Sequence, residues 1–289
     1  MFRQCATTSQ SRAMKIGVVG LGLIGGSVAM AYKAAGHVVY GYDTDSTILG
    51  YAKLSGVIDD ALSSERYPLC DLIILAATPK AMVSYIAENA SAIPSSVLVM
   101  DFCGVKEEIC SVGFEAAARY GFTYVGGHPM AGLQYSGFKH ARATLFNGAS
   151  MIIVPPVYDD MALLERVKES LAPLEFKQLV VTTAENHDAM IAYTSQLCHV
   201  VSNAFVKSPA AQKHHGYSAG SFRDLTRVAR LNENMWTELF LDNKKPLLGE
   251  LDRIINSLQQ YRDAIENDDA QTLCSLLREG RIAKEQSEG

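Results

Sequence analysis

A glycine-rich turn between an apolar strand and a helix constrains this chain more than any other segment. The apolar run Lys15–Gly20 leads into Gly20-Leu21-Gly22-Leu23-Ile24-Gly25, and a helical pattern follows over Ile24–Ala35. In such a turn the first glycine bends the chain, the second lets the backbone approach a pyrophosphate, and the third lets helix and strand pack closely. The segment predicts a dinucleotide site at Gly20, Gly22, Leu23, Ile24 and Gly25.

An acidic residue at the end of the second predicted strand completes this pattern. Asp43 follows Val38–Tyr42 and lies 18 positions after Gly25, close to the roughly 20 that the fingerprint requires. A carboxylate there accepts hydrogen bonds from both ribose hydroxyls and repels a 2′-phosphate. No Arg or Lys lies between Asp43 and Gly50. We therefore expect NAD rather than NADP; the alternative is a glycine turn without a ligand.

Strand and helix patterns alternate through the rest of the first half. This alternation is typical of βαβ units, and right-handed crossovers then give a doubly wound, mostly parallel sheet of the Rossmann type. The further predicted strands are Leu72–Ala76, Val97–Asp101, Thr123–Gly126 and Met151–Val154, with helices at Ala81–Ala90 and Val105–Arg119.

The second half is predicted to be all-helical. Asn186–Val206 is one long helical run, and Ser208-Pro209 ends it. Apolar residues recur at helical spacing from Leu247 to Ile265, and Asp268-Asp269 is placed to cap a last helix. We therefore predict a disordered extension over residues 1–13, a Rossmann domain over 14–172 and an all-α domain over 173–289.

Composition excludes several classes of protein. Of the 289 residues 48% are hydrophobic and 20% charged, which is typical of a globular protein rather than a disordered one. The net charge of −5 argues against nucleic-acid binding, and no apolar run reaches the roughly 18 residues of a membrane helix. The six cysteines form no C-x-x-C pair, and His214-His215 has no ligand partner at suitable spacing. We expect a cytoplasmic protein without a metal site.

Loops after later strands should also face the cofactor, because ligands bind at the carboxyl ends of parallel strands. Ala77-Thr78-Pro79 and Asp101-Phe102-Cys103-Gly104 occupy such positions. We therefore include Thr78, Pro79, Cys103 and Gly104 in the predicted cofactor site. The alternative is that these residues only form turns and bind no ligand.

A histidine follows the next predicted strand. His128 lies in Gly126-Gly127-His128-Pro129-Met130-Ala131-Gly132. An imidazole titrates near neutrality, so it can accept a hydroxyl proton while hydride leaves the same carbon. Next to a nicotinamide site this favours a catalytic base over a structural histidine. His187 and His140 are expected on the surface.

Together these motifs resemble the prephenate dehydrogenase family, which includes arogenate dehydrogenases. The His128 segment is close to a family motif, and two later segments are similar to the family's Ser-His-Leu-Pro-His and Gly-Gly-Phe-Arg-Asp-Thr-Thr-Arg-Ile-Ala. They are Ser195-Gln196-Leu197-Cys198-His199 and Gly220-Ser221-Phe222-Arg223-Asp224-Leu225-Thr226-Arg227-Val228-Ala229, with Met235-Trp236 and Asn243 beyond. The resemblance covers nearly the whole chain from Met14. It implies NAD-dependent oxidative decarboxylation of prephenate to 4-hydroxyphenylpyruvate in tyrosine biosynthesis, by a homodimer joined through its helical domain.

The resemblance also implies roles for single residues. His128 matches the family's catalytic histidine, Arg227 an arginine that binds a substrate carboxylate, and His199 a histidine of the substrate site. A guanidinium fork suits a carboxylate. Ser195 and Arg223 each lie one helical turn before these residues on the same face, so we include them in the predicted substrate site. A structural ion pair for Arg223 and a core position for His199 are the alternatives.

The chain departs from the family pattern in two places. Gly104 stands where the family has a serine that hydrogen-bonds the catalytic histidine, and water, the Cys103 thiol or a backbone group could replace that serine. Gln196 and Cys198 replace a histidine and a proline, which leaves open whether prephenate or arogenate is the substrate.

Two other hypotheses remain besides an arogenate dehydrogenase. A β-hydroxyacid dehydrogenase or imine reductase is disfavoured, because those hydroxyacid enzymes use a lysine that the inner face of Asn186–Val206 lacks. A catalytically weak NAD-binding sensor is favoured only by Gly104.

Overall fold

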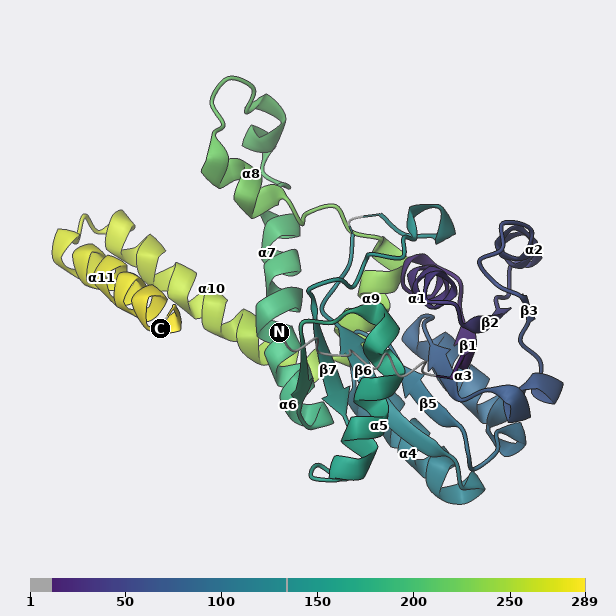
Figure 1. Ribbon diagram of the computed structural model, residues 1–289. Helices are drawn as coiled ribbons and strands as arrows, with labels where there is room; N and C mark the ends of the chain where they lie inside the picture. Colours follow the sequence, from purple (N-terminus) through teal and green to yellow (C-terminus); the bar gives the residue numbers. More distant parts are fainter. Residues whose placement is uncertain (1–11, 134, 289) are drawn as a thin grey trace, which may run out of the picture. The chain divides into compact units, whose positions relative to one another are not determined.

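The computed structural model describes residues 12–133 and 135–288, which fall into two compact units (Figure 1). The first unit comprises residues up to 190 together with 230–242, and the second comprises 191–229 and 243–289. The domain boundary that we predict between residues 172 and 173 differs from this division. The strand that follows it, and most of the next helix, belong to the first unit. The predicted extension over 1–13 falls outside the described residues, except for Arg12 and Ala13.

An eight-stranded sheet forms the centre of the first unit. Its order is β3-β2-β1-β4-β5-β6-β7-β8, and every neighbouring pair is parallel except β6 and β7. This confirms the doubly wound, mostly parallel sheet. The strands are β1 (Lys15–Val19), β2 (Val38–Tyr42), β3 (Asp60–Ala61), β4 (Leu72–Leu75), β5 (Leu98–Asp101), β6 (Thr123–Pro129), β7 (Ser150–Val154) and β8 (Gln178–Val181).

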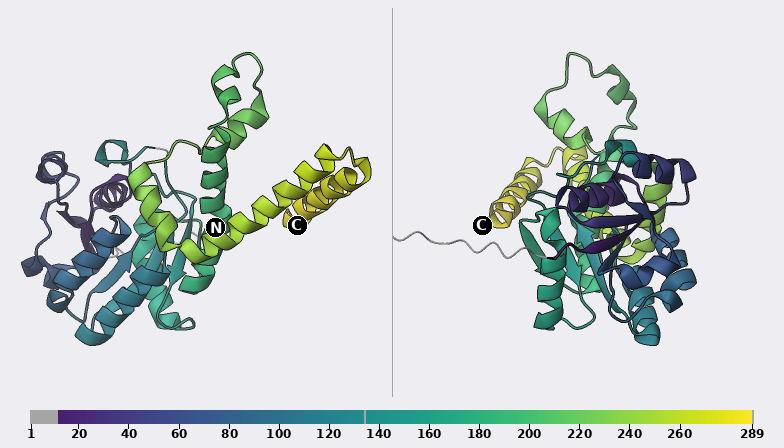
Figure 2. Two further views of the ribbon diagram at one scale, coloured as in Figure 1. Left: turned by 180° about the vertical axis from the view of Figure 1, so that it is seen from behind. Right: turned by 45° about the vertical axis from the view of Figure 1, so that its right-hand side comes forward.

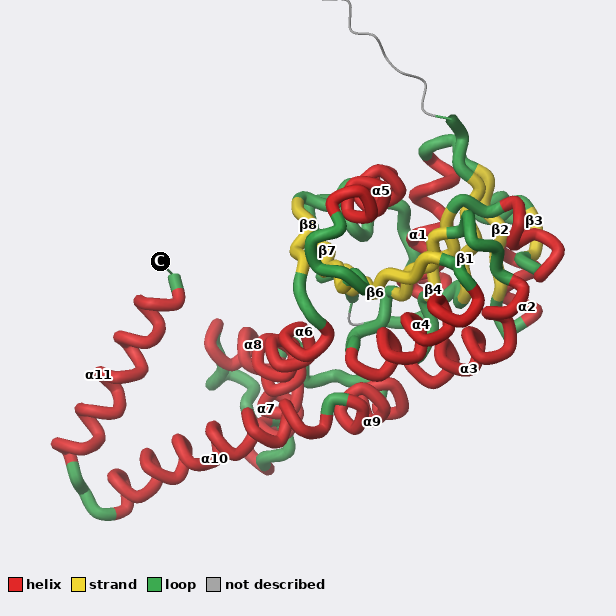
Figure 3. The backbone as a smooth tube through the Cα atoms, turned by 90° about the horizontal axis from the view of Figure 1, so that it is seen from below, coloured by secondary structure: helices red, strands yellow, loops and turns green. Residues whose placement is uncertain are grey.

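Helices cover both faces of this sheet. Figure 3 shows α1 and α5 on one side of the strands and α3 and α4 on the other. Two apolar clusters follow the same division, since side chains of α1 and α5 belong to one and those of α3 and α4 to the other. The helices of this unit are α1 (Leu23–Ala34), α2 (Ser46–Leu54), α3 (Pro79–Asn89), α4 (Glu107–Tyr120), α5 (Met161–Leu171), α6 (Ala184–Ile191, its last residue in the second unit) and α9 (Glu233–Asp242).

Strand β6 is longer than the sequence pattern predicts. The predicted strand ends at Gly126, whereas β6 continues to Pro129 because it pairs antiparallel with β7. His128 therefore lies within a strand, opposite Ile152, rather than in a glycine-rich loop after it. Pairing with β7 holds the backbone of His128 and fixes where its side chain starts.

The second unit is entirely helical within the described residues. The predicted helix over 186–206 is present, but a π-helical turn, η5 (Ala192–Leu197), interrupts it between α6 and α7. The remaining helices of the unit are α7 (Cys198–Phe205), α8 (Gly220–Thr226), α10 (Lys244–Glu266) and α11 (Ala270–Ser287).

Helices α10 and α11 form an antiparallel pair, which the left view of Figure 2 shows. The Tyr261 hydroxyl donates to the Leu276 carbonyl oxygen at 3.2 Å and ties the two helices together. Asp269 caps α11 through a bond from the Thr272 N–H, as the sequence predicts. None of the helices in the described part of the chain is long and apolar enough to cross a membrane.

Candidate active site

The glycine turn between β1 and α1 is built as its sequence predicts. Gly20 has a φ of +85°, which favours glycine, and a Cβ there would lie 2.6 Å from the Ala76 carbonyl oxygen. A Cβ at Gly25 would lie 1.8 Å from the carbonyl oxygen of Gly20. Both positions therefore require glycine, because any side chain would force the turn or the neighbouring strand to move.

The N-terminus of α1 next to this turn fits the pyrophosphate of a dinucleotide. Helix α1 begins at Leu23, and Gly22 before it supplies no side-chain cap to the first N–H groups, including that of Ile24. Apart from its two chain neighbours, none of the described residues places a heavy atom within 4 Å of where a Cβ on Gly22 would be. An uncapped helix N-terminus with open space beside its glycine favours an anion through its N–H groups and its dipole.

Asp43 at the end of β2 is oriented by backbone groups on both of its oxygens. Oδ2 accepts from the N–H of Leu21 at 2.7 Å, and Oδ1 accepts from the N–H of Asp45 at 2.9 Å. The carboxylate thus ties the glycine turn to the start of α2. Its position fits the ribose-binding acid of a dinucleotide fold.

The loop after β4 leads into α3, whose N-terminus is covered by a distant carboxylate. Thr78 precedes the helix and Pro79 occupies its first position. The N–H of Lys80 donates to Oε1 of Glu238 on α9 at 2.7 Å. A carboxylate is favourable at a helix N-terminus. Glu238 was not among the predicted residues, because no local pattern links α9 to this loop.

The loop after β5 separates the environments of Cys103 and Gly104. The Cys103 side chain is buried in the apolar cluster beneath α3 and α4, and burial raises the pKa of its thiol to about 12. The thiol is therefore a protonated core group. Gly104 lies beside the predicted base, since a Cβ there would be 4.0 Å from Nε2 of His128 and 3.3 Å from Cδ2 of Leu239.

His128 is the first member of a chain of three hydrogen-bonded side chains. Its Nδ1 lies 2.8 Å from Nε2 of His187, and Nδ1 of His187 lies 2.7 Å from Oδ1 of Asp188. Asp188 also accepts from the N–H of Lys106 at 2.7 Å and of Glu107 at 2.8 Å. The expectation that His187 is a surface residue was wrong, because only 3% of it is exposed.

Both imidazoles are held in their neutral form. Burial lowers the pKa of His128 well below its ordinary value of 6.5, and the neighbouring His187 and Lys106 act in the same direction. Burial also lowers the pKa of His187, although its hydrogen bond to Asp188 opposes this. A neutral His128 at pH 7 can accept a proton, which a general base requires.

A buried ion pair lies below this chain. Asp101 accepts from Nζ of Lys106 and, at 2.7 Å, from the Tyr124 hydroxyl, and all three side chains are almost fully buried. Burial alone would lower the pKa of Lys106, but the Asp101 carboxylate and nearby groups raise it above its ordinary value. Lys106 therefore stays charged. Its side chain is anchored by Asp101, and its own backbone N–H donates to Asp188.

The predicted substrate residues lie in the second unit. Ser195 is part of the π-helical turn η5, and its carbonyl oxygen lies 2.8 Å from Nδ1 of His199. Single π-helical turns often occur at functional sites. Burial and the charge of Arg227 lower the pKa of His199, which also shows that the two residues are near each other. Arg223 and Arg227 lie one turn apart at the end of α8, and both are exposed.

Gln196 has a structural partner in the same unit. Its Oε1 accepts from Nδ2 of Asn243 at 2.7 Å, and both residues are buried. The pair joins the π-helical turn to the start of α10. The residue that departs from the family motif is thus part of the packing of the helical unit.

His187 and Asp188 are the functional residues that sequence reasoning missed. The sequence around these two residues carries no local signal for such a role, because their partner lies on a distant strand. The contact with His128 itself spans 59 positions and depends on how α6 returns to the end of β6.

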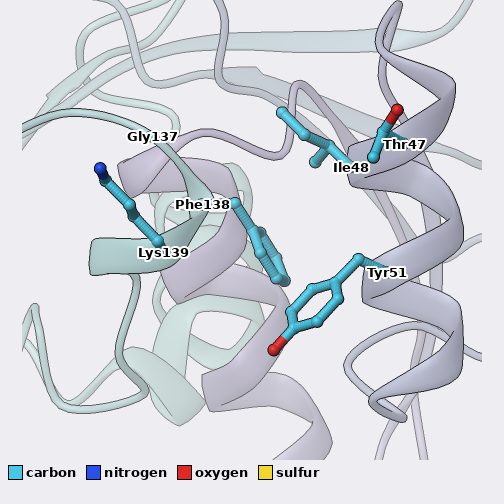
Figure 4. Close-up of a pocket in the computed structure, with 6 residues that line it drawn as sticks. All are labelled: Thr47, Ile48, Tyr51, Gly137, Phe138 and Lys139. Atoms are coloured by element: carbon cyan, nitrogen blue, oxygen red, sulfur yellow. The ribbon is translucent and has the colours of Figure 1, made fainter.

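A cavity of about 480 Å³ lies elsewhere in the first unit, between α2 and residues 137–139 (Figure 4). The rings of Tyr51 and Phe138 point toward one another across it, edge to face, with centroids 5.8 Å apart. None of the predicted site residues lines it; its lining comprises Thr47, Ile48, Tyr51, Gly137, Phe138 and Lys139. Within the described residues, no group of three or more His, Cys, Asp or Glu is placed to hold a metal ion.

Two family models match this chain over most of its length. The model for the prephenate dehydrogenase nucleotide-binding domain matches residues 28–180, and the model for the prephenate dehydrogenase dimerization domain matches residues 183–279. The prephenate dehydrogenase of Bacillus subtilis (strain 168) is 32% identical, with 94% of this chain and 75% of the relative covered.

Two solved structures are similar over nearly the whole chain. The prephenate dehydrogenase from A. aeolicus, crystallised with hydroxyphenyl propionate and NAD+, has a TM-score of 0.79 at 26% identity; 96% of this chain and 99% of that one are covered. The Synechocystis arogenate dehydrogenase has a TM-score of 0.78 at 27% identity, with 95% of this chain and 100% of that one covered.

Proposed function

This chain belongs to the prephenate dehydrogenase family, and from that premise we propose that it oxidises and decarboxylates prephenate to 4-hydroxyphenylpyruvate with NAD, in tyrosine biosynthesis. One observation in the first unit carries the proposal. The neutral imidazole of His128 lies on β6 of the same sheet whose β1 and β2 end in the glycine turn and Asp43. Ligands of such sheets bind at the carboxyl ends of parallel strands.

The glycine turn and Asp43 hold the cofactor in this proposal. The N–H groups at the start of α1 bind the pyrophosphate beside Gly22, and the Asp43 carboxylate binds the adenosine ribose. Leu23, Ile24, Thr78 and Pro79 complete the cofactor site. NAD, when bound, supplies the hydride acceptor. Asp43 and the nearby Asp45 both disfavour a 2′-phosphate, which supports NAD over NADP.

His128 acts on the ring hydroxyl of the substrate. Nε2 of His128 accepts the hydroxyl proton while the carbinol C–H bond breaks and its electron pair leaves as hydride. The carbinol carbon becomes a carbonyl, and the bond to the ring carboxylate then breaks with loss of CO2. The electron pair of that bond enters the ring, which becomes aromatic as the carbonyl oxygen becomes a phenoxide. That oxygen then takes up a proton from water and forms the hydroxyl of the product. The chain's own task is therefore to orient the hydroxyl and remove one proton.

Residues of the helical unit bind the substrate in this proposal. Arg227 binds a substrate carboxylate through its guanidinium fork, and His199 contacts the substrate nearby. Ser195 and Arg223 lie one turn away from these residues and complete the set. The proximity of His199 and Arg227 within the unit supports their assignment to one substrate site.

Because Gly104 has no hydroxyl, another group must make the hydrogen bond that the family's serine makes to the catalytic histidine. The buried Cys103 thiol is a poor candidate because it lies in the apolar core. We favour a water molecule beside Gly104, since glycine leaves the space next to Nε2 of His128 without a side chain. Cys103 and Gly104 then contribute to the cofactor site through their backbone.

The proposal includes a homodimer in the cytoplasm. The dimerization-domain match supports the dimer, and so do apolar side chains that α10 leaves exposed. Those side chains are Leu248, Ile255, Leu258 and Ile265. An exposed apolar stripe of this kind is typical of an interface. A biosynthetic role that uses NAD supports the cytoplasm.

The experiment is an absorbance assay of NADH formation by the purified protein. Prephenate and arogenate are each supplied with NAD and, separately, with NADP. Turnover with prephenate and NAD is the expected result. Turnover with arogenate alone would leave the proposed mechanism unchanged but would make arogenate the substrate and tyrosine the direct product. No turnover with either, despite NAD binding, would overturn the proposal in favour of a weak NAD-binding sensor.

A further inference from the structure

The hydrogen-bonded chain from His128 to Asp188 has a direction that the contacts themselves define. Oδ1 of Asp188 accepts from the Lys106 N–H, and Oδ2 accepts from the Glu107 N–H. Neither of these donors can reverse its role, because a backbone N–H only donates. A carboxylate has no hydrogen to donate and is acceptor-only. Asp188 therefore accepts the third bond too, from Nδ1 of His187.

This assignment fixes the proton positions on both rings. When Nδ1 of His187 carries the hydrogen, Nε2 of the neutral ring has only a lone pair. Nε2 of His187 must then accept the bond from His128, so Nδ1 of His128 carries its hydrogen. The remaining nitrogen of His128, Nε2, is left with a lone pair. This is the nitrogen that lies next to Gly104.

We propose that His187 and Asp188 are positioning residues for the reaction: they hold His128 in the tautomer whose Nε2 can accept the substrate's hydroxyl proton. The inference rests on the proposed function and adds residues to which the resemblance assigned no role. Neither residue needs to touch the substrate. Each acts through the next, from Asp188 to His187 to His128.

The surroundings support a functional rather than a purely structural chain. The charged groups that face these rings are Lys106, Asp101 and Asp188. Lys106 opposes a positive charge on either ring, whereas Asp188 favours one on His187. When Nε2 of His128 accepts a proton, the bond to His187 and on to Asp188 therefore links its charge to a carboxylate, and Asp101 also favours positive charge on His187. A buried polar chain of this kind is costly unless every member is satisfied.

Tautomers are directly measurable by nitrogen NMR on the protein with 15N-labelled histidine. A protonated and an unprotonated ring nitrogen have well-separated 15N shifts. At pH 7.5 we expect Nε2 of His128 and Nε2 of His187 to be unprotonated and both Nδ1 atoms to carry hydrogen. The His128→Asn and His187→Gln variants assign the signals. A proton on Nε2 of His128 in the native protein would overturn the proposal.

Kinetics of His187 variants give the second test. His187→Leu keeps the bulk but offers no acceptor to His128, so kcat should fall by at least about 10–100-fold, the loss found when the hydrogen-bond partner of a metal-binding histidine is removed. His187→Gln retains an acceptor oxygen and should lose about fivefold or less, the equivalent of one ordinary hydrogen bond. KM should change little in both.

His37→Leu is the matched control. His37 accepts from the N–H of Met14 at 3.1 Å, near the start of β1 and away from the chain described here. It should leave kcat unchanged, and thermal unfolding verifies that all three variants are folded. If the native enzyme turns over and His187→Leu matches its kcat, the positioning role is wrong. If the native enzyme does not turn over, the proposed function fails, while the NMR result still decides the tautomer.

Discussion

Gly104 lies next to the predicted base, His128: a Cβ atom on Gly104 would lie 4.0 Å from Nε2 of His128. The loop after β5 and the strand β6 therefore converge at Nε2 of the predicted base. A serine at position 104 would place its hydroxyl within reach of this nitrogen. The glycine thus removes a hydrogen-bonding group from the point at which the family places one.

Restoring that hydroxyl should increase the rate. In Gly104→Ser and in Gly104→Ala the added Cβ meets Cδ2 of Leu239 at 3.3 Å, which a flexible side chain can relieve. The two variants therefore differ only in the hydroxyl. We expect kcat of the serine variant to exceed that of the alanine variant by about fivefold, the equivalent of one hydrogen bond. Equal values would show that position 104 does not act on His128.

The dependence of activity on pH should reflect the lowered pKa of His128. Burial, His187 and Lys106 keep the imidazole neutral, and His199 is shifted in the same direction by burial and Arg227. A base with a lowered pKa keeps its active, neutral form to lower pH. We therefore expect kcat/KM for prephenate to be flat through pH 7–8 and to fall only below pH 6.5. Half-maximal activity above pH 6.5 would contradict the assignment.

Breaking the buried ion pair should destabilise the first unit strongly. Lys106→Met leaves the Asp101 carboxylate buried without its cation, and such changes cost about 3–5 kcal/mol. The surface pair of Lys33 with Asp59 gives the control, and Lys33→Met should cost less than about 1 kcal/mol. Urea unfolding at equal protein concentration measures both. A loss below about 1 kcal/mol in Lys106→Met would disprove the structural role of this pair.

Substrate affinity should depend on Arg227. A charge-assisted hydrogen bond to a carboxylate contributes about 1.5–3 kcal/mol, so Arg227→Ala should raise KM for prephenate by roughly 10–150-fold. The KM for NAD should not change. Arg278→Ala on α11 removes the same charge from another exposed position and serves as the control. An unchanged KM in Arg227→Ala would remove this arginine from the substrate site.

The parts of the site that could be predicted from the sequence are those with a local pattern. Gly20 and Gly25 lie in one turn, and Asp43 follows β2 at a fixed spacing from them; the structure confirms the backbone reason for both glycines. The principal strands could be predicted because their side chains are buried on both faces, as in β4 and β5. Such strands read as short, continuous apolar runs.

The parts that could not be predicted depend on contacts between distant segments. Strand β8 lies at the edge of the sheet, and its apolar run over 179–181 is only three residues long, too short to indicate a strand. Helix α9 returns to the first unit, where Glu238 and Leu239 reach α3 and Gly104. The bond of His187 to His128 likewise exists only once α6 is placed beside β6.

The most direct test of the whole account is the turnover of His128→Asn with prephenate and NAD. An amide in place of the imidazole cannot accept the hydroxyl proton at neutral pH, so kcat should fall by about 10²–10⁴-fold. The affinity for NAD, measured by calorimetry, should be retained, because the glycine turn and Asp43 are unchanged. A loss of less than about tenfold would contradict the assignment of His128 as the base.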